Sequence, residues 1–439
     1  MTARVFHTSD WHLGRQIAGR HRRDAEFDAV LHEITYIATE SDPDLIVHSG
    51  DLFDGPRPSL DDVRRAAHTL RRLGEIAPVM VVAGNHDTRH VLSFLNFTLN
   101  DMWDSGAERR VRFATDARPE GLLIAEYPSA RGESTVRVAA LPYLHPNRFA
   151  YEFADGATAT TYADRMRAVQ TDVYRRLTHD RGPDDVLVFA AHLFVEGATP
   201  SYSERPISVE SDYAASVSGL PIVDYGALGH IHKPQGIGGI GFPARYAGSP
   251  LQMDFGETRD TKSVVLAEIA PGKDPRIEVV PLESGRRLVK LAGTLDEIAM
   301  TASRVGDSWV KATVHTDGPT LALAETLAQM LPKATIVDID ELRPGTESQI
   351  LDHATTVAEL PSVEQLLREY LSDGRVTGPA LDRVMATLAQ IQADPDPADR
   401  TLCCEENLLT AAIDGRGIDG FDRSGVLTGT EITDSEVLP

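Results

Sequence analysis

Four short apolar segments of the chain, at residues 4–8, 45–48, 79–83 and 186–191, each run directly into a cluster of polar residues. Their length and β-branched content are typical of buried strands that end in loops. Helix-like stretches at 24–40 and 60–73 separate the first three, the second with Ser59 as N-cap and Gly74 after its end. This alternation predicts an α/β fold with a largely parallel sheet, in which functional groups collect at the carboxyl ends of the strands.

The chain of 439 residues is longer than one hydrophobic core usually covers, so we expect more than one domain. Further strand-like stretches follow His192 and complete a first domain, which we place at 1–281. Strand-like segments around a helix at 320–330 predict a small α+β domain at 285–343.

The C-terminal part predicts two elements of a different kind. Apolar residues at helical spacing predict a two-helix hairpin at 361–392. Residues 395–439 are rich in Gly and Asp without periodicity, which predicts a disordered tail. From Glu341 to Pro439 the chain holds 19 acidic and seven basic side chains, so much of its negative charge lies here.

The composition and the N-terminal sequence indicate the cellular location of the protein. No uninterrupted apolar run is long enough to cross a bilayer, and the N-terminus enters a strand without the basic and apolar regions of a signal peptide. We therefore expect a cytoplasmic protein. The only cysteines, Cys403 and Cys404, are adjacent and supply neither a disulfide framework nor a structural zinc site.

The first two strand ends carry candidate metal ligands. Asp10 and His12 are separated by one residue, so both side chains can leave an extended segment toward one ion. Asp51 follows Gly50 directly after the second strand, and a carboxylate there can bridge two cations. Alone, each motif is equally well explained by a surface pair or a capping aspartate.

The third strand ends in Gly84-Asn85-His86-Asp87, a more specific motif. Asn85 offers a neutral amide oxygen to a metal. We expect His86 to stay off the metal, stabilise the phosphate in the transition state and protonate the leaving oxygen, so it needs a partner that fixes its tautomer. Asp54 is the candidate for that partner and Asp87 is the alternative.

Three more histidines follow later strands. His192 ends the segment at 186–191, and His230 and His232 follow Gly229 with one residue between them. Imidazole suits Mn, Fe or Zn. By contrast, His7 and His48 lie within strands and are predicted to be core residues or supports of the site.

Together these motifs resemble those of the calcineurin-like metallophosphoesterases. The amino-acid sequences of residues 8–15, 49–54 and 229–235 resemble those of a group of bacterial DNA-repair nuclease subunits within that family. The resemblance implies the family's α/β sandwich with a small α+β capping domain and a C-terminal helical hairpin. It also implies two Mn²⁺ ions per chain, with Mg²⁺, Fe²⁺ or Zn²⁺ as alternatives. One ion would be held by Asp10, His12, Asp51 and His232, and the other by Asp51, Asn85, His192 and His230.

The resemblance further implies phosphodiester hydrolysis in DNA, as an exonuclease and endonuclease, with His86 beside the scissile phosphate. The hairpin would grip a coiled-coil ATPase, and two chains would form a homodimer within a heterotetramer. A net charge of −23 fits a DNA substrate only if basic side chains gather near the site. The predicted DNA contacts are Arg15, Arg20, Arg22, Arg23 and Arg57, and the alternative for each is a solvated side chain.

Two other functions compete with this interpretation. Metal ligands alone do not specify a substrate, so a calcineurin-like phosphodiesterase or phosphatase could act on a small or protein substrate. The capping domain and hairpin argue against it. A scaffold without catalytic activity ranks last, because every expected ligand is present.

Overall fold

The computed structural model describes residues 2–101, 110–116, 122–131, 134–145, 162–201, 203–204, 214–318, 320 and 322–343, with four single positions further on. The chain divides into two units, Met1–Pro344 and Gly345–Pro439, and all the named helices and strands lie in the first. The predicted hairpin at 361–392 lies outside the described residues except at Arg368, Leu381, Val384 and Met385, which are helical. The predicted tail at 395–439 lies wholly outside them. No helix in the described part of the chain is long and apolar enough to cross a membrane.

The first sheet has six strands in the order β12-β11-β1-β2-β3-β4. Its centre is parallel and consists of β1 (Ala3–Thr8), β2 (Leu45–His48), β3 (Val79–Val82) and β4 (Val111–Ala114). β11 (Ser263–Ile269) pairs antiparallel with β1, and β12 (Arg276–Pro281) pairs antiparallel with β11. The first three predicted strands are therefore neighbours, and their carboxyl ends meet at one edge.

The second sheet also has six strands, in the order β5-β6-β7-β8-β10-β9. The parallel strands are β6 (Thr135–Leu141), β7 (Val186–His192), β8 (Tyr225–Gly229) and β10 (Ala244–Tyr246). β5 (Leu123–Pro128) and β9 (Gln235–Gly236) pair antiparallel at the two edges.

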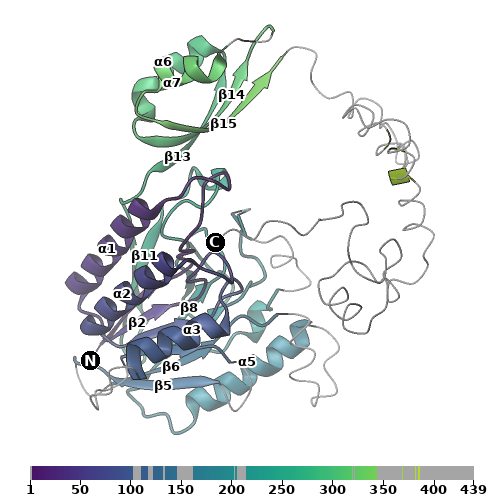
Figure 1. Ribbon diagram of the computed structural model, residues 1–439. Helices are drawn as coiled ribbons and strands as arrows, with labels where there is room; N and C mark the ends of the chain where they lie inside the picture. Colours follow the sequence, from purple (N-terminus) through teal and green to yellow (C-terminus); the bar gives the residue numbers. More distant parts are fainter. Residues whose placement is uncertain are drawn as a thin grey trace, which may run out of the picture. The chain divides into compact units, whose positions relative to one another are not determined.

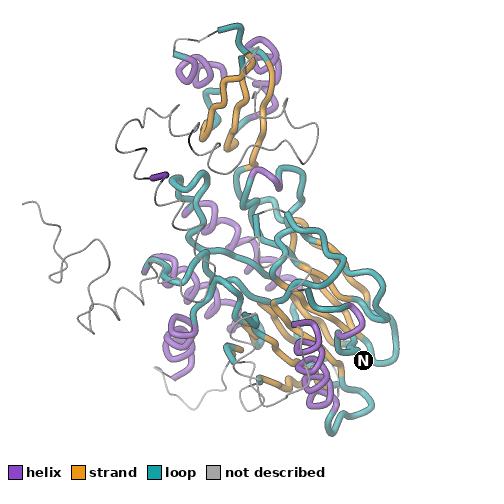
Figure 2. The backbone as a smooth tube through the Cα atoms, turned by 90° about the vertical axis from the view of Figure 1, so that its right-hand side faces the viewer, coloured by secondary structure: helices purple, strands orange, loops and turns teal. Residues whose placement is uncertain are grey.

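The two sheets pack face to face and are covered by helices on their outer faces (Figures 1 and 2). Apolar side chains from both sheets, including Val5, Val47, Val138 and Val188, form the core between them. The outer face of the first sheet packs against α1 (Asp24–Ser41), α2 (Leu60–Ile76) and α3 (Arg89–Asn96). The outer face of the second packs against α5 (Tyr162–Thr178). The predicted α/β sandwich is confirmed.

Most predicted elements of this part are present, with shifted ends. Ser59 caps α2 by accepting a hydrogen bond from the Asp62 amide, as expected. The helix does not end before Gly74, however, but continues to Ile76. A Cβ at Gly74 would lie 3.2 Å from Val111, so this glycine permits close packing of α2 on β4.

A third, smaller sheet follows, with the order β13-β14-β15. Its strands, β13 (Arg287–Gly293), β14 (Ser308–His315) and β15 (Thr335–Leu342), all run parallel. They are joined by α6 (Leu295–Val305) and α7 (Leu323–Met330). Strands and helices therefore alternate, whereas the sequence suggested an α+β arrangement, because α6 was not recognised between the first two strands.

The small sheet contacts the first sheet's helices and loops through a compact cluster. Ile17 packs there with Leu288, Trp309 and Val337. The indole nitrogen of Trp309 donates a 2.8 Å hydrogen bond to the buried carboxylate of Glu26 on α1.

Candidate metal centre

The predicted ligands come together where the parallel strands of both sheets end. Asp10, His12, Asp51 and Asn85 follow strands of the first sheet, while His192, His230 and His232 end or follow strands of the second. All but Asn85 are nearly or completely buried. Four of them, Asp10, His12, Asp51 and His230, have φ between 47° and 104°. Such left-handed backbone in non-glycine residues costs about 1–3 kcal/mol each and is typical of functional sites.

Asp51 lies at the centre of the cluster. Its Oδ2 is 3.4 Å from Nε2 of His12 and 3.4 Å from Nε2 of His192. Its Oδ1 accepts a 2.8 Å hydrogen bond from the main-chain amide of His86. One carboxylate therefore faces ligands from both sheets.

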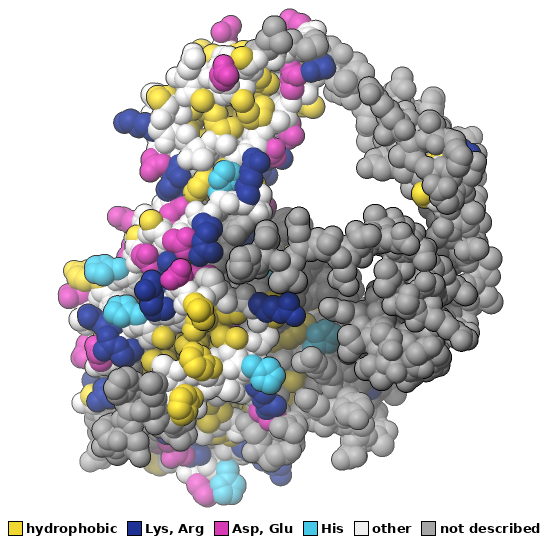
Figure 3. All heavy atoms as spheres, viewed as in Figure 1, with side chains coloured by type: hydrophobic (Ala, Val, Ile, Leu, Met, Phe, Trp, Pro, Cys, Tyr) yellow, Lys and Arg dark blue, Asp and Glu magenta, His cyan; other side chains and the backbone are white. Residues whose placement is uncertain are grey.

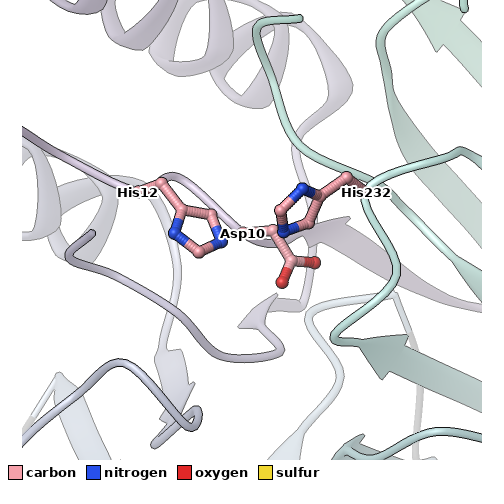
Figure 4. A group of neighbouring side chains, drawn as sticks. All are labelled: Asp10, His12 and His232. Carbon is pink, nitrogen blue, oxygen red and sulfur yellow. The ribbon is translucent and has the colours of Figure 1, made fainter. Parts of the chain in front are cut away.

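One side of the centre is formed by Asp10, His12 and His232, whose donor atoms all lie within 4.8 Å of one another. Figure 4 shows a ring nitrogen of His12 and one of His232 turned toward the Asp10 side chain. The ring centroids of His12 and His232 are 4.6 Å apart. The Asp10 carboxylate also accepts from the main-chain amide of His230, at 3.1 Å, which ties the two sheets together here.

The other side is formed by Asn85, His192 and His230. The amide oxygen of Asn85 lies 3.0 Å from Nε2 of His192 and 2.8 Å from Nδ1 of His230. His192 turns its Nδ1 to the main-chain oxygen of Ser49, 2.9 Å away. Because Nδ1 donates there, Nε2 is left to face Asp51 and Asn85.

His86 lies beside the cluster and is half-buried. Its ring centroid is 4.7 Å from that of His12, and together with His12 and Asp51 it forms another group of close donor atoms. Its Nδ1 lies 2.6 Å from the main-chain oxygen of Asp54. That contact fixes the orientation of the ring.

The orienting partner of His86 is thus the backbone of Asp54, not the carboxylate that the sequence suggested. The Asp54 carboxylate instead lies 3.5 Å from Nδ1 of His12 and 3.3 Å from Arg15. The alternative, Asp87, accepts hydrogen bonds from the main-chain amides of Leu52, Phe53 and Gly84 and so shapes the loop.

The electrostatics of the cluster favour a bound cation. Burial raises the pKa of Asp10 to about 7, and the nearby Asp51 adds to this rise, although His192 and His12 oppose it. Burial alone would lower the pKa of His192, yet Asp51 and Asp10 raise it to about 9. Two carboxylates buried this closely need positive charge beside them, which divalent ions supply.

The oxygen and imidazole donors of the cluster also suit a divalent metal ion. Both ring nitrogens of His12 are buried and have no hydrogen-bond partner among the described residues, although they lie close to carboxylates. Oxygen and imidazole donors together suit Mn, Fe or Zn. The residues present therefore match what a divalent metal requires.

Sequence reasoning missed several residues that support the ligands. Ser203 and Glu257 lie against Nδ1 of His232, Lys262 pairs with Glu257, and Glu204 accepts from the His232 amide. The ring of Tyr143 stacks on that of His230, with centroids 5.8 Å apart. No spacing pattern in the sequence marks them, because they come from three separate segments of the chain, at 143, 203–204 and 257–262.

The arginines predicted to contact DNA have different surroundings. Arg23 must be corrected: its side chain is completely buried, pairs with Glu26 and donates to the main-chain oxygen of Gln252. It therefore supports the fold and cannot reach DNA in this conformation. Arg20 donates to the main-chain oxygen of Val337 in the small sheet.

The other three arginines are more accessible. Arg15 pairs with Asp54 at 3.3 Å, Arg22 pairs with Asp24 at 2.7 Å, and Arg57 is exposed. On the face shown in Figure 3, Lys and Arg side chains are interspersed with Asp and Glu and do not form one continuous basic surface.

Comparison with known proteins agrees with this site. Residues 3–234 match the calcineurin-like phosphoesterase family, so the chain belongs to that family and is a metallophosphoesterase, a hydrolase. The class implies a dinuclear metal site, for which the cluster supplies candidate ligands.

The chain's relatives define its group more narrowly. It is 31% identical to SbcD, the D component of nuclease SbcCD, from Bacillus subtilis, over 84% of this chain and 92% of the relative. It is 30% identical to the SbcD component of Escherichia coli K12, over 67% and 72%. The SbcD component of Staphylococcus epidermidis is 25% identical, over 69% and 75%. The chain is a member of this SbcD group of metallophosphoesterases.

Proposed function

We propose that the chain is the nuclease subunit of an SbcCD-type complex and hydrolyses phosphodiester bonds in DNA during repair and recombination. The observation that carries this proposal is the convergence of seven oxygen and imidazole donors, with His86 beside them, in a chain whose relatives are named as nucleases. These names favour the nuclease over a phosphatase acting on small or protein substrates.

In this proposal the cluster holds two Mn²⁺ ions. Asp10, His12, Asp51 and His232 would hold one ion, and Asp51, Asn85, His192 and His230 the other. Two such ions supply charge neutralisation at phosphate oxygens and an activated water at neutral pH. The mixture of carboxylate, amide and imidazole donors supports Mn²⁺, although Fe²⁺ and Zn²⁺ share this preference and Mg²⁺ prefers oxygen alone.

The chain's own residues would orient the substrate and move a proton. His86, held at Nδ1 by the Asp54 carbonyl, points Nε2 toward the substrate, where it can donate to a phosphate oxygen and then protonate the leaving oxygen. The main-chain amide of His86 donates a hydrogen bond to Asp51, so the position of His86 is tied to that of the central carboxylate. Arg15, Arg22 and Arg57 are the accessible candidates for contacts with the DNA backbone.

The partner in this proposal is an SbcC-like coiled-coil ATPase, because the relatives are named as components of the SbcCD nuclease. Residues 361–392 would bind it, and two chains would form a homodimer within a heterotetramer. Such a complex would act on chromosomal DNA in the cytoplasm.

The test is cleavage of labelled linear and hairpin DNA by the purified chain in Mn²⁺, with and without the partner ATPase. A small aryl phosphodiester is assayed in parallel. Cleavage of DNA supports the nuclease. Hydrolysis of the aryl ester without any DNA cleavage would keep the metal centre but reject DNA as the substrate.

A further inference from the structure

His232 contacts two residues from distant parts of the chain on the side away from the metal centre. Its Nδ1 lies 2.6 Å from the hydroxyl of Ser203 and 3.5 Å from Oε1 of Glu257. The Ser203 hydroxyl also donates to that same Glu257 oxygen. Since Nδ1 is used in this way, Nε2 is the nitrogen left to face Asp10 and His12 (Figure 4).

The hydrogen-bond donors available in this chain, from His232 through Ser203 to Glu257, determine where the protons lie. An ionised carboxylate can only accept hydrogen bonds, and a serine has one proton to give. Because Ser203 gives its proton to Glu257, its oxygen must accept from Nδ1–H of His232. The ring is then the tautomer with a lone pair on Nε2, which is the form that binds a metal.

Glu257 is built to remain charged at this position. It is completely buried, and its second oxygen, Oε2, lies 2.6 Å from Lys262 Nζ and accepts a 3.0 Å hydrogen bond from the Met253 amide. Lys262 also donates to the main-chain oxygen of His232, at 2.9 Å. The Glu257–Lys262 ion pair therefore supports His232 in two places. Glu257 supports the ring through Ser203, and Lys262 binds the main-chain oxygen.

The segment that carries Glu257 is anchored at several points. It forms a short helical turn, Phe255–Glu257, capped by the side chain of Asp254. Gln252 donates to the main-chain oxygen of Glu257 and accepts from the Leu288 amide in the small sheet. Phe255 packs on the cluster that joins the small sheet to the rest of the unit. The carboxylate is thus fixed in place before any ion binds.

We propose that Glu257 is a positioning residue which, through Ser203, holds His232 in the tautomer and orientation that bind the cation on the Asp10 and His12 side. This inference deepens the proposed function and rests on its metal centre. It predicts a defect in metal affinity at one of the two sites, which a role in folding alone would not produce.

The test is calorimetric titration of Mn²⁺ alone into the full chain and into serine variants. Ser203→Ala is expected to bind one of the two ions about 10–100-fold more weakly, as removal of such supporting contacts typically does. Ser201→Ala is the matched control, because Ser201 is a buried serine two residues away whose hydroxyl has no hydrogen-bond partner in the part of the chain that the structure describes. Ser203→Thr keeps the hydroxyl and should restore the affinity.

Glu257→Gln should weaken binding of the same ion. It also leaves buried Lys262 with only the more distant Asp260, 3.9 Å away, as its counter-charge, which lowers stability, so the serine variants decide. Two strong Mn²⁺ sites in Ser203→Ala, equal to those of the control, would overturn the inference while leaving the metal centre intact. Failure of the wild-type chain to bind Mn²⁺ would overturn the centre itself, and the inference with it.

Discussion

At the scale of single residues, the backbone does as much as the side chains to build the centre. Asp51 has a φ of 54°, and a main-chain carbonyl, that of Asp54, orients His86. Strand-end motifs correctly indicate which side chains meet. They cannot indicate that a carbonyl replaces a carboxylate as partner, because every residue has a carbonyl and only the loop conformation aims it.

This distinction makes Asp54→Asn informative. The substitution keeps the carbonyl that holds His86 but removes the negative charge 3.5 Å from His12. We expect Mn²⁺ affinity to fall about tenfold, because His12 loses a supporting carboxylate, while DNA cleavage at saturating Mn²⁺ falls less than tenfold. Calorimetry and initial rates measure the two quantities.

Asp61→Asn, at an exposed position at the start of α2, controls for the loss of one charge. If Asp54→Asn instead lowered the saturated rate as much as removal of His86, with unchanged Mn²⁺ affinity, the carboxylate and not the carbonyl would be the orienting group.

Other residues show where sequence reasoning reaches its limit. Arg23 follows the first motif as closely as Arg22 does, yet it turns inward, where the Glu26 carboxylate and the main-chain oxygen of Gln252 accept its hydrogen bonds. Ser203 and Glu257 are separated from His232 by 29 and 25 residues, so only the folded chain brings them to it.

At the scale of elements, the site depends on how closely the ends of the two sheets approach. A Cβ at Gly229, the last residue of β8, would lie 2.1 Å from the main-chain oxygen of Ser49 and 2.4 Å from the Ser9 hydroxyl. Both serines belong to the other sheet's strand ends. Glycine at 229 is therefore what lets His230 reach Asp10.

Gly229→Ala should lower the free energy of unfolding by about 1–3 kcal/mol, since a rigid backbone oxygen must move. It should also weaken Mn²⁺ binding, because the adjacent His230 shifts. Gly238→Ala is the control, as a Cβ there would meet no atom of the described residues within 4 Å. Denaturant unfolding without metal measures the first effect. Equal stability of the two variants would contradict the close approach of the sheets.

The central strands are the elements that the sequence predicts best. β2 has the expected limits, since it is a short, largely apolar segment between polar residues. β5 and α6 were not recognised, because β5 alternates buried and exposed residues at a sheet edge and α6 buries only Ile298 and Val305.

At the scale of the whole molecule, two buried histidines make stability depend on pH. Burial lowers the pKa of His7 to about 3, with Arg245 adding to the effect, and burial lowers that of His48 to about 3 as well. In the folded chain both histidines stay neutral from pH 6.5 down to about 3. In the unfolded chain the same two histidines take up protons below pH 6.5. Stability is therefore full above pH 6.5 and falls as the pH drops toward 3.

His7→Gln should reduce this dependence by up to about 1.4 kcal/mol per pH unit, the value for one proton. Denaturant unfolding in a chelator between pH 5 and 7 measures the slope. His68→Gln, an exposed position on α2, should leave the slope unchanged. Equal slopes for wild type and His7→Gln would mean that His7 is not held neutral by the fold.

The most direct measurement of the central claim is the rate of Mn²⁺-dependent DNA cleavage by the wild type and by His86→Ala, together with their Mn²⁺ stoichiometry. We predict that the variant still binds two Mn²⁺ ions but cleaves about 10²–10⁴-fold more slowly, because it has lost its proton donor and not its metal centre. Undiminished cleavage by His86→Ala would contradict the account, because this cluster would then not be the active site.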